Sequence, residues 1–187
     1  RRSSDLRIRA IDIGVLLSAG IINIDVVKRP EVAIFPTGTE IIEPESEPEE
    51  GSIIESNSRM FENMVTVAGG IGHRFPPIPD DYEQIKTKIS DAVDRFDLVI
   101  VNAGSSAGTE DYTVHVLREL GEVIVHGVSI KPGKPVILAI VRGKPVIGLP
   151  GYPVSAYIGF ENFVIPVLQL MGRRREKTAE TVEAHIS

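Results

Sequence analysis

The sequence has 187 residues, of which 42% are hydrophobic, and this is enough for one well-buried domain. Its 26 acidic side chains outnumber the 20 basic ones, and the formal charge of −6 argues against a nucleic acid as partner. The chain contains no cysteine, so it can form neither a disulfide nor a thiolate metal site. The longest apolar stretch, residues 154–170, is interrupted by Glu161, Asn162 and Gln169. We expect a core helix there and no membrane as partner.

The two ends of the chain differ from its middle. Apolar residues at helical spacing over residues 12–20, with Gly20 behind them, predict a short helix that ends at a glycine. We expect residues 1–29 to be a linker and short helix from a preceding domain, and residues 30–172 to form one α/β domain. Residues 173–187 are expected to be a linker towards a C-terminal domain outside this chain.

Strands and helices alternate along the middle of the chain. Apolar runs predict strands over residues 31–35, 73–78, 97–101, 123–128, 136–141 and 145–149. Helices are expected from Ser56 or Asn57, from Asp81, over residues 112–120, and after Pro153. Residues 43–50 are mostly Glu and Pro, which predicts a solvated loop. This order predicts a three-layer α/β/α fold whose central sheet is mostly parallel, and which a hairpin at residues 142–144 makes mixed.

Ligands of such sheets collect outside the carboxyl ends of the strands, so the loops after Phe35, Val101 and Leu149 are expected to converge. The loop over residues 102–111 is rich in small residues and precedes a helix. Backbone amides and the positive end of a helix suit a phosphate at such a loop. An ordinary strand-to-helix turn would explain the same residues.

Carboxylates recur at predicted loop positions: Glu40, Asp80, Asp81 and Asp111. Carboxylates that converge with phosphates are a common way to hold Mg²⁺. Asp81 has another interpretation, because Gln84 stands three positions later and the pair is typical of a helix cap.

Two further turns carry candidate anion-binding groups. Lys131 and Lys134 flank a Pro-Gly turn, and two rigidly presented ammonium groups suit an oxyanion such as phosphate or molybdate. A surface turn with incidental lysines is the alternative. Residues 148–153 read Gly-Leu-Pro-Gly-Tyr-Pro, ahead of Ser155 at a predicted helix start. This segment is either another anion site lined by backbone amides or an ordinary turn formed by proline and glycine.

Taken together and in this order, these segments resemble the molybdopterin molybdotransferase family, which includes MoeA proteins and the corresponding domain of gephyrin. The matching segments are Arg29-Pro30, Thr37-Gly38-Thr39-Glu40, Ser56-Asn57, Asp80-Asp81, Gly104 to Gly108 with Asp111-Tyr112-Thr113, Lys131 to Pro135, and Gly148 to Gly151 with Pro153 and Ser155. The resemblance implies binding of molybdopterin or its adenylate, hydrolysis of the adenylate with Mg²⁺, and transfer of molybdate. It also implies a cytoplasmic protein that is a homodimer at full length, with the pterin and molybdate as its small-molecule partners.

The same resemblance assigns roles to individual residues. It implies that Glu40, Asp80 and Asp111 are the catalytic and metal-binding carboxylates, and that Lys131 and Lys134 bind the oxyanion. The implied substrate contacts are Thr37, Gly104, Ser105, Ser106, Gly108, Pro150, Gly151 and Ser155.

Departures from the family pattern keep two alternatives open. Tyr152 stands where the family has Asn, and Thr39 where it has Asp. A catalytically silent pterin-binding or assembly module is therefore one alternative. A related enzyme of the same fold is the other, either a molybdopterin adenylyltransferase or the amidase-linked domain of nicotinamide-nucleotide recycling proteins. The order and spacing of residues 131–135 and 148–153 favour the molybdotransferase.

Overall fold

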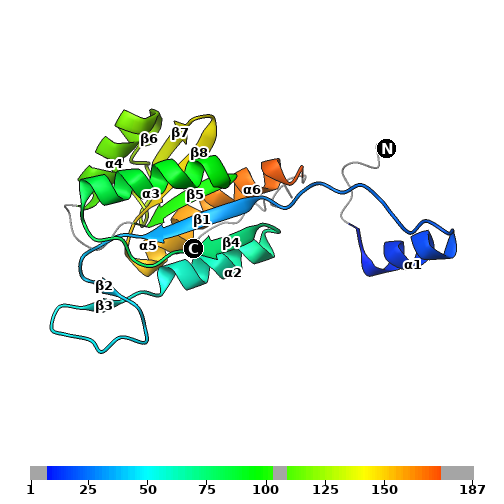
Figure 1. Ribbon diagram of the computed structural model, residues 1–187, viewed down its shortest axis with the longest axis horizontal. Helices are drawn as coiled ribbons and strands as arrows, with labels where there is room; N and C mark the ends of the chain where they lie inside the picture. Colours follow the sequence, from blue (N-terminus) through cyan, green and yellow to red (C-terminus); the bar gives the residue numbers. More distant parts are fainter. Residues whose placement is uncertain (1–7, 103–108, 174–187) are drawn as a thin grey trace, which may run out of the picture.

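A computed structural model describes residues 8–102 and 109–173, without the side chains of residues 109–111. Its centre is a six-stranded sheet in the order β4-β1-β5-β8-β7-β6 (Figure 1). The strands are β1 (Glu31–Pro36), β4 (Ile71–Arg74), β5 (Leu98–Asn102), β6 (Glu122–His126), β7 (Ile137–Val141) and β8 (Lys144–Leu149). Strands β4, β1, β5 and β8 are parallel, while β7 runs antiparallel to both β8 and β6. The predicted mixed sheet and its late hairpin are confirmed.

Helices cover both faces of this sheet. On one face, α2 (Asn57–Val67) packs beside one long helix made of α5 (Pro153–Gly159), the π-helical segment η2 (Phe160–Val164) and α6 (Ile165–Met171). On the other face lie α3 (Tyr82–Arg95) and α4 (Thr109–Leu120). Side chains alternate between the two cores along each strand: Val32 and Ile34 face α2, whereas Ala33 and Phe35 face α3. The three-layer α/β/α fold predicted from the sequence is therefore confirmed.

The long helix over Pro153–Met171 is long and apolar enough, by length and composition, to cross a membrane. Its residues Ala156, Phe160, Val164 and Leu168 are nevertheless buried against the sheet. Their spacing of four places them on one helix face. Phe160 also stacks on Phe61 of α2, with ring centroids 5.2 Å apart. This packing is that of the core helix expected from the sequence.

The strand predicted over residues 73–78 is wrong in its bounds, because β4 is Ile71–Arg74. Pro76 and Pro77 follow, and a proline has no N–H to donate to a neighbouring strand. Ile78 forms only an isolated parallel bridge with Thr37. The chain is thereby carried along the end of β1 to the start of α3.

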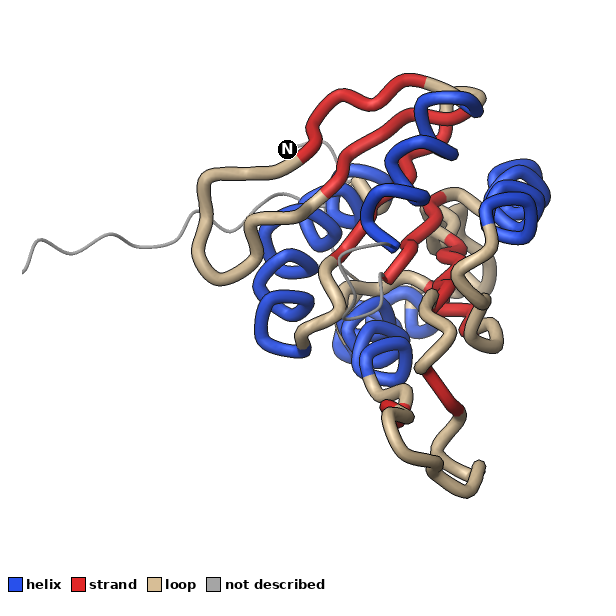
Figure 2. Tube along the Cα trace, turned by 90° about the vertical axis from the view of Figure 1, so that its left-hand side faces the viewer, coloured by secondary structure: helices blue, strands red, loops and turns tan. Residues whose placement is uncertain are grey.

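Two segments project from the three layers. The first is α1 (Ala10–Ser18), which buries none of its residues and stands apart from the sheet (Figure 1). Gly20, with a φ of 77°, follows α1 as the sequence predicted. The second is the acidic loop over residues 43–50, between the short parallel strands β2 (Ile41–Ile42) and β3 (Ile53–Ile54). Figures 1 and 2 both show this arm outside the helical layers.

Candidate functional site

The loops that follow β1, β5 and β8 meet at the carboxyl ends of these strands. The backbone N–H of Thr37 donates to the Asn102 carbonyl at 2.8 Å, and the Thr37 hydroxyl donates to the same oxygen at 3.3 Å. The Asn102 side chain donates in turn to the carbonyl of Pro150 at 2.8 Å. These contacts confirm the predicted convergence of the three loops, and they bring Thr37 and Pro150 to the same place.

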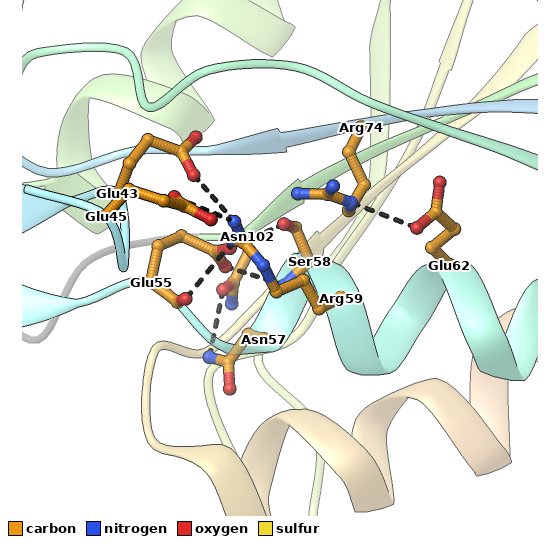
Figure 3. A network of polar contacts seen from close by, with 9 residues as sticks. All are labelled: Glu43, Glu45, Glu55, Asn57, Ser58, Arg59, Glu62, Arg74 and Asn102. Atoms are coloured by element: carbon orange, nitrogen blue, oxygen red, sulfur yellow. Dashed lines mark hydrogen bonds and ion pairs between the residues drawn. The ribbon is translucent and has the colours of Figure 1, made fainter.

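Asn57, the first residue of α2, ties a fourth segment into this junction (Figure 3). Its Nδ2 donates to Asn102 Oδ1 at 3.0 Å and to the carbonyl of Gly151 at 2.8 Å. Both side chains are buried, with exposed fractions of 8% for Asn57 and 4% for Asn102. A neutral pair of side-chain amides thus ties the helix to the loops after β5 and β8 without any charge, and the backbone carbonyl of Asn102 adds the loop after β1.

A pocket of about 70 Å³ opens at this junction. Its apolar wall residues are Pro36, Ile41, Ile53, Ile54 and Pro153, and its polar ones include Thr37, Glu55, Asn57 and Asn102. Apolar walls with a few directed polar groups are typical of a small-molecule site. A pocket of this size admits part of such a ligand and not all of it.

A buried carboxylate, Glu55, holds the amino-terminal end of α2. It is 4% exposed and accepts hydrogen bonds from the backbone N–H and the hydroxyl of Ser58, both at 2.6 Å. Arg59 donates to Glu55 at 2.9 Å and to Glu43, at the base of the acidic arm, at 2.9 Å (Figure 3). The hydrogen bond to Glu43 is the largest cause of a raised pKa at Arg59. Ser56, one of the two residues expected at the helix start, occupies the N-cap position but makes no capping bond, and Glu55 binds the backbone N–H of Ser58 instead.

Two of the three predicted metal ligands lie on neighbouring loops. Thr37 pairs with Ile78 through an isolated bridge, and Thr39 Oγ1 accepts from the backbone N–H of Asp80 at 3.1 Å. The turns that carry Glu40 and Asp80 therefore run side by side. Asp80 Oδ1 is buried and has no hydrogen-bond partner among the described residues, which fits a carboxylate oxygen that meets a cation.

Asp81 differs from its neighbour, because its Oδ1 accepts from the backbone N–H of Gln84 at 2.8 Å and caps α3. The helix-cap interpretation of Asp81 is thus confirmed. Within the described side chains, which do not include that of Asp111, no three His, Asp or Glu residues gather as a metal site. The assignment of Glu40, Asp80 and Asp111 to a metal therefore stays a prediction.

The lysine turn lies against the first turn of α5. Gly133 is buried with a φ of 109°, and a Cβ built on it would stand 3.4 Å from the backbone oxygen of Ser155. Lys131 and Lys134 are exposed on either side of it, and neither forms an ion pair with a residue in the described ranges. The structure thus brings the turn of the two predicted oxyanion-binding lysines to Ser155.

The glycine-rich loop falls outside the described residues, and with it the predicted contacts Gly104, Ser105, Ser106 and Gly108. Only its two ends are placed. β5 ends at Asn102, inside the junction, and α4 begins at Thr109.

Sequence reasoning missed Asn102 and Glu55 as site residues, and it gave Asn57 no role of its own. The signal for Asn102 was present, because it is the polar end of an otherwise apolar five-residue strand. Glu55 gave no such signal, since a glutamate next to an acidic loop is ordinarily a solvated residue.

Comparison with known proteins shows the family and the fold of this chain. Residues 33–170 match the family described as a probable molybdopterin binding domain. The chain belongs to this family of molybdopterin-binding domains. A MoeA molybdopterin biosynthesis protein from a Pyrococcus species has a similar structure, with a TM-score of 0.83 at 38% identity over 91% of this chain and 42% of that one. The six-stranded α/β sheet is therefore the fold of the MoeA-type proteins of molybdenum cofactor biosynthesis.

Two sequence relatives of this molybdopterin-binding domain are longer proteins. The molybdopterin molybdenumtransferase of Nostoc is 31% identical over 173 residues, which make up 90% of this chain and 40% of that protein. The Drosophila melanogaster molybdenum cofactor synthesis protein cinnamon is 33% identical over 154 residues, or 82% of this chain and 26% of that protein. The chain thus spans less than half of either relative.

Proposed function

We propose that this domain binds molybdopterin or its adenylate at the junction of the β1, β5 and β8 loops, and serves molybdate insertion as part of a molybdotransferase. The observation that carries the proposal is the convergence of Thr37, Asn102 and Gly151, which lines an apolar pocket with directed hydrogen-bonding groups. The name of the Nostoc relative supports the reaction, since that protein is a molybdopterin molybdenumtransferase.

The substrate contacts divide by chemistry. Thr37 and Gly151 line the pocket, where they contact the pterin, and Pro150 stands next to Gly151 in the same loop. Backbone amides of the loop with Gly104, Ser105, Ser106 and Gly108 bind the phosphate at the start of α4. Lys131 and Lys134 hold molybdate beside Ser155, because their ammonium groups are exposed and free of ion pairs within the described ranges.

The carboxylates serve a cation at the edge of this junction. Glu40, Asp80 and Asp111 would hold Mg²⁺, which supplies charge neutralisation at the adenylate phosphates. The buried Asp80 Oδ1 fits this role because no described group occupies it. The hydrogen bond from the Asp80 N–H to Thr39 positions the carboxylate.

The two ends of the chain are proposed to connect this domain to other domains of a longer protein. α1 is apolar yet buries no residue, and relatives extend well beyond the matched region, which supports residues 1–29 and 173–187 as connections to neighbouring domains. We infer a cytoplasmic homodimer for the whole protein. The silent module and the adenylyltransferase-like enzyme are not favoured, because the Pyrococcus, Nostoc and Drosophila relatives, at 31–38% identity, are a MoeA protein, a molybdenumtransferase and a molybdenum cofactor synthesis protein.

A titration with molybdopterin and with its adenylate, each with and without Mg²⁺, tests the proposal. Lys134→Ala and Asp80→Asn are the test variants. Lys88→Ala and Asp91→Asn, both exposed on α3, are the matched controls. We expect saturable binding that weakens in the test variants alone, and Asp80→Asn to remove the effect of Mg²⁺. Absence of binding by the folded protein, or equal losses in the controls, would contradict the proposal.

A further inference from the structure

We propose that Asn57 is a specificity-determining residue of the pocket, and that its Oδ1 accepts a hydrogen bond from the exocyclic amino group of the bound pterin. This inference rests on the proposed function, because it names one contact within the same site. It follows from the orientation of two buried amides.

The orientation of Asn102 is fixed by backbone groups. Its Nδ2 approaches the carbonyl oxygens of Leu149, at 3.4 Å, and of Pro150, at 2.8 Å. A carbonyl only accepts hydrogen bonds, so the side of Asn102 that faces the two carbonyls must be its NH₂ group. The Asn102 oxygen then necessarily points to Asn57.

The orientation of Asn57 follows from that of Asn102. Its Nδ2 lies 3.0 Å from Asn102 Oδ1 and 2.8 Å from the carbonyl oxygen of Gly151, and both of these atoms are acceptors. A flipped Asn57 would place oxygen against oxygen twice, so the NH₂ group must face them. Figure 3 shows the Asn57 nitrogen directed to Asn102 and its oxygen directed away.

The side-chain oxygen of Asn57 is the one acceptor of this amide pair that has no donor among the described residues. Asn57 Oδ1 is buried and has no partner among the described residues, although Asn57 as a whole lines the pocket. A buried polar atom without a partner is unfavourable and calls for a ligand or a water. Because the network fixes it as an acceptor, its missing partner must be a donor.

The amino-bearing edge of a pterin is such a donor. The pocket of about 70 Å³ has space for the edge of a ring, and its apolar wall of Ile41, Ile53 and Ile54 suits the ring faces. Because Oδ1 is buried, contact with the amino group requires a small local rearrangement, which is common on binding. Molybdopterin carries this amino group, and a deaminated pteridine does not.

A pair of simple ligands tests the inference. The affinities of pterin and of 4-oxopteridine, which lacks the 2-amino group, are measured by fluorescence titration. We expect the wild-type protein to prefer pterin on the order of tenfold, the size of one good hydrogen bond. The preference should vanish in Asn57→Ala and persist in Asn63→Ala, an exposed asparagine of the same helix.

The test does not depend on the stability of Asn57→Ala, because the preference for pterin over 4-oxopteridine is first measured in the wild-type protein. The ¹⁵N resonance of the Asn57 side-chain amide in the wild type gives a second readout. This resonance should shift with pterin and not with 4-oxopteridine. Equal affinities for pterin and 4-oxopteridine, in a protein that binds molybdopterin, would overturn the inference. The partner of Asn57 Oδ1 would then be a structural water, and the proposed function would stand. If neither molybdopterin nor its adenylate binds, the inference and the proposed function both fail.

Discussion

Two polar clusters of this domain have opposite characters. At the carboxyl end of the sheet, the Asn57–Asn102 pair is buried, uncharged and tied to backbone carbonyls. Across the α3–α4 surface, Glu119 accepts from Tyr82 and pairs with Lys86 at 2.6 Å, with all three side chains in contact with solvent. The side chains of the buried pair join three segments of chain, namely α2, the end of β5 and the loop after β8, whereas the exposed cluster joins two helices. This comparison predicts that stability and ligand binding depend on the first and hardly on the second.

The largest effect is expected for Asn102→Ala. The substitution leaves the carbonyl of Pro150 without its donor and removes one of the two acceptors of the Asn57 NH₂ group, so the free energy of unfolding should fall by about 3 kcal/mol. Chemical denaturation measures this loss. Asn63→Ala should change the unfolding free energy by less than about 0.5 kcal/mol, since that side chain is exposed. Similar losses in the two variants would mean that the amide pair is not a structural clamp.

A smaller effect is expected for Glu55→Gln. Glutamine keeps the shape of the side chain but weakens the charge-assisted bonds from Ser58 and Arg59, at a cost of about 1–2 kcal/mol in unfolding free energy. The matched control is Glu62→Gln, which loses an exposed ion pair with Arg74 worth about 0.5 kcal/mol. Thermal unfolding compares the two. A control that is as destabilised as Glu55→Gln would remove the distinction between buried and exposed carboxylates.

The smallest effect belongs to the exposed cluster and depends on pH. The hydrogen bond from Lys86 is the largest cause of a lowered pKa at Glu119, whose ordinary value is 4.5. A carboxyl group with a lowered folded-state pKa stabilises the fold above its ordinary pKa, and this contribution is lost as the pH falls through the lowered value. The loss should be slight, because the cluster is exposed.

An NMR titration below pH 5 compares the response of the exposed Lys86–Glu119 cluster with that of the buried Asn57–Asn102 pair. The Lys86 and Glu119 signals should shift as Glu119 is protonated. The side-chain amide of Asn102, which has no titrating group, serves as the internal reference and should stay constant until the protein unfolds. Earlier movement of the Asn102 signal would show that the two clusters are coupled.

The sequence predicted the layers of this fold because strands buried on both faces are nearly continuous apolar runs, as over Leu98–Asn102. It also predicted the Asp81 cap, whose partner Gln84 is three residues away. It could not predict the Asn57–Asn102 pair, since 45 residues separate the two amides and only the fold brings them together. The end of β4 was misplaced for a local reason, because the hydrophobic pattern continues through Pro76 and Pro77 while the hydrogen bonds cannot.

The most direct test of the central claim is a ¹H–¹⁵N NMR map of the backbone amides during titration with molybdopterin. Thr37, Asn57 and Gly151 should show the largest shifts, because they meet at the pocket. The amides of Lys86 and Glu119 should not move. Shifts confined to the α3–α4 surface, or no shifts at saturating molybdopterin, would contradict the assignment of the pterin site to the carboxyl ends of β1, β5 and β8.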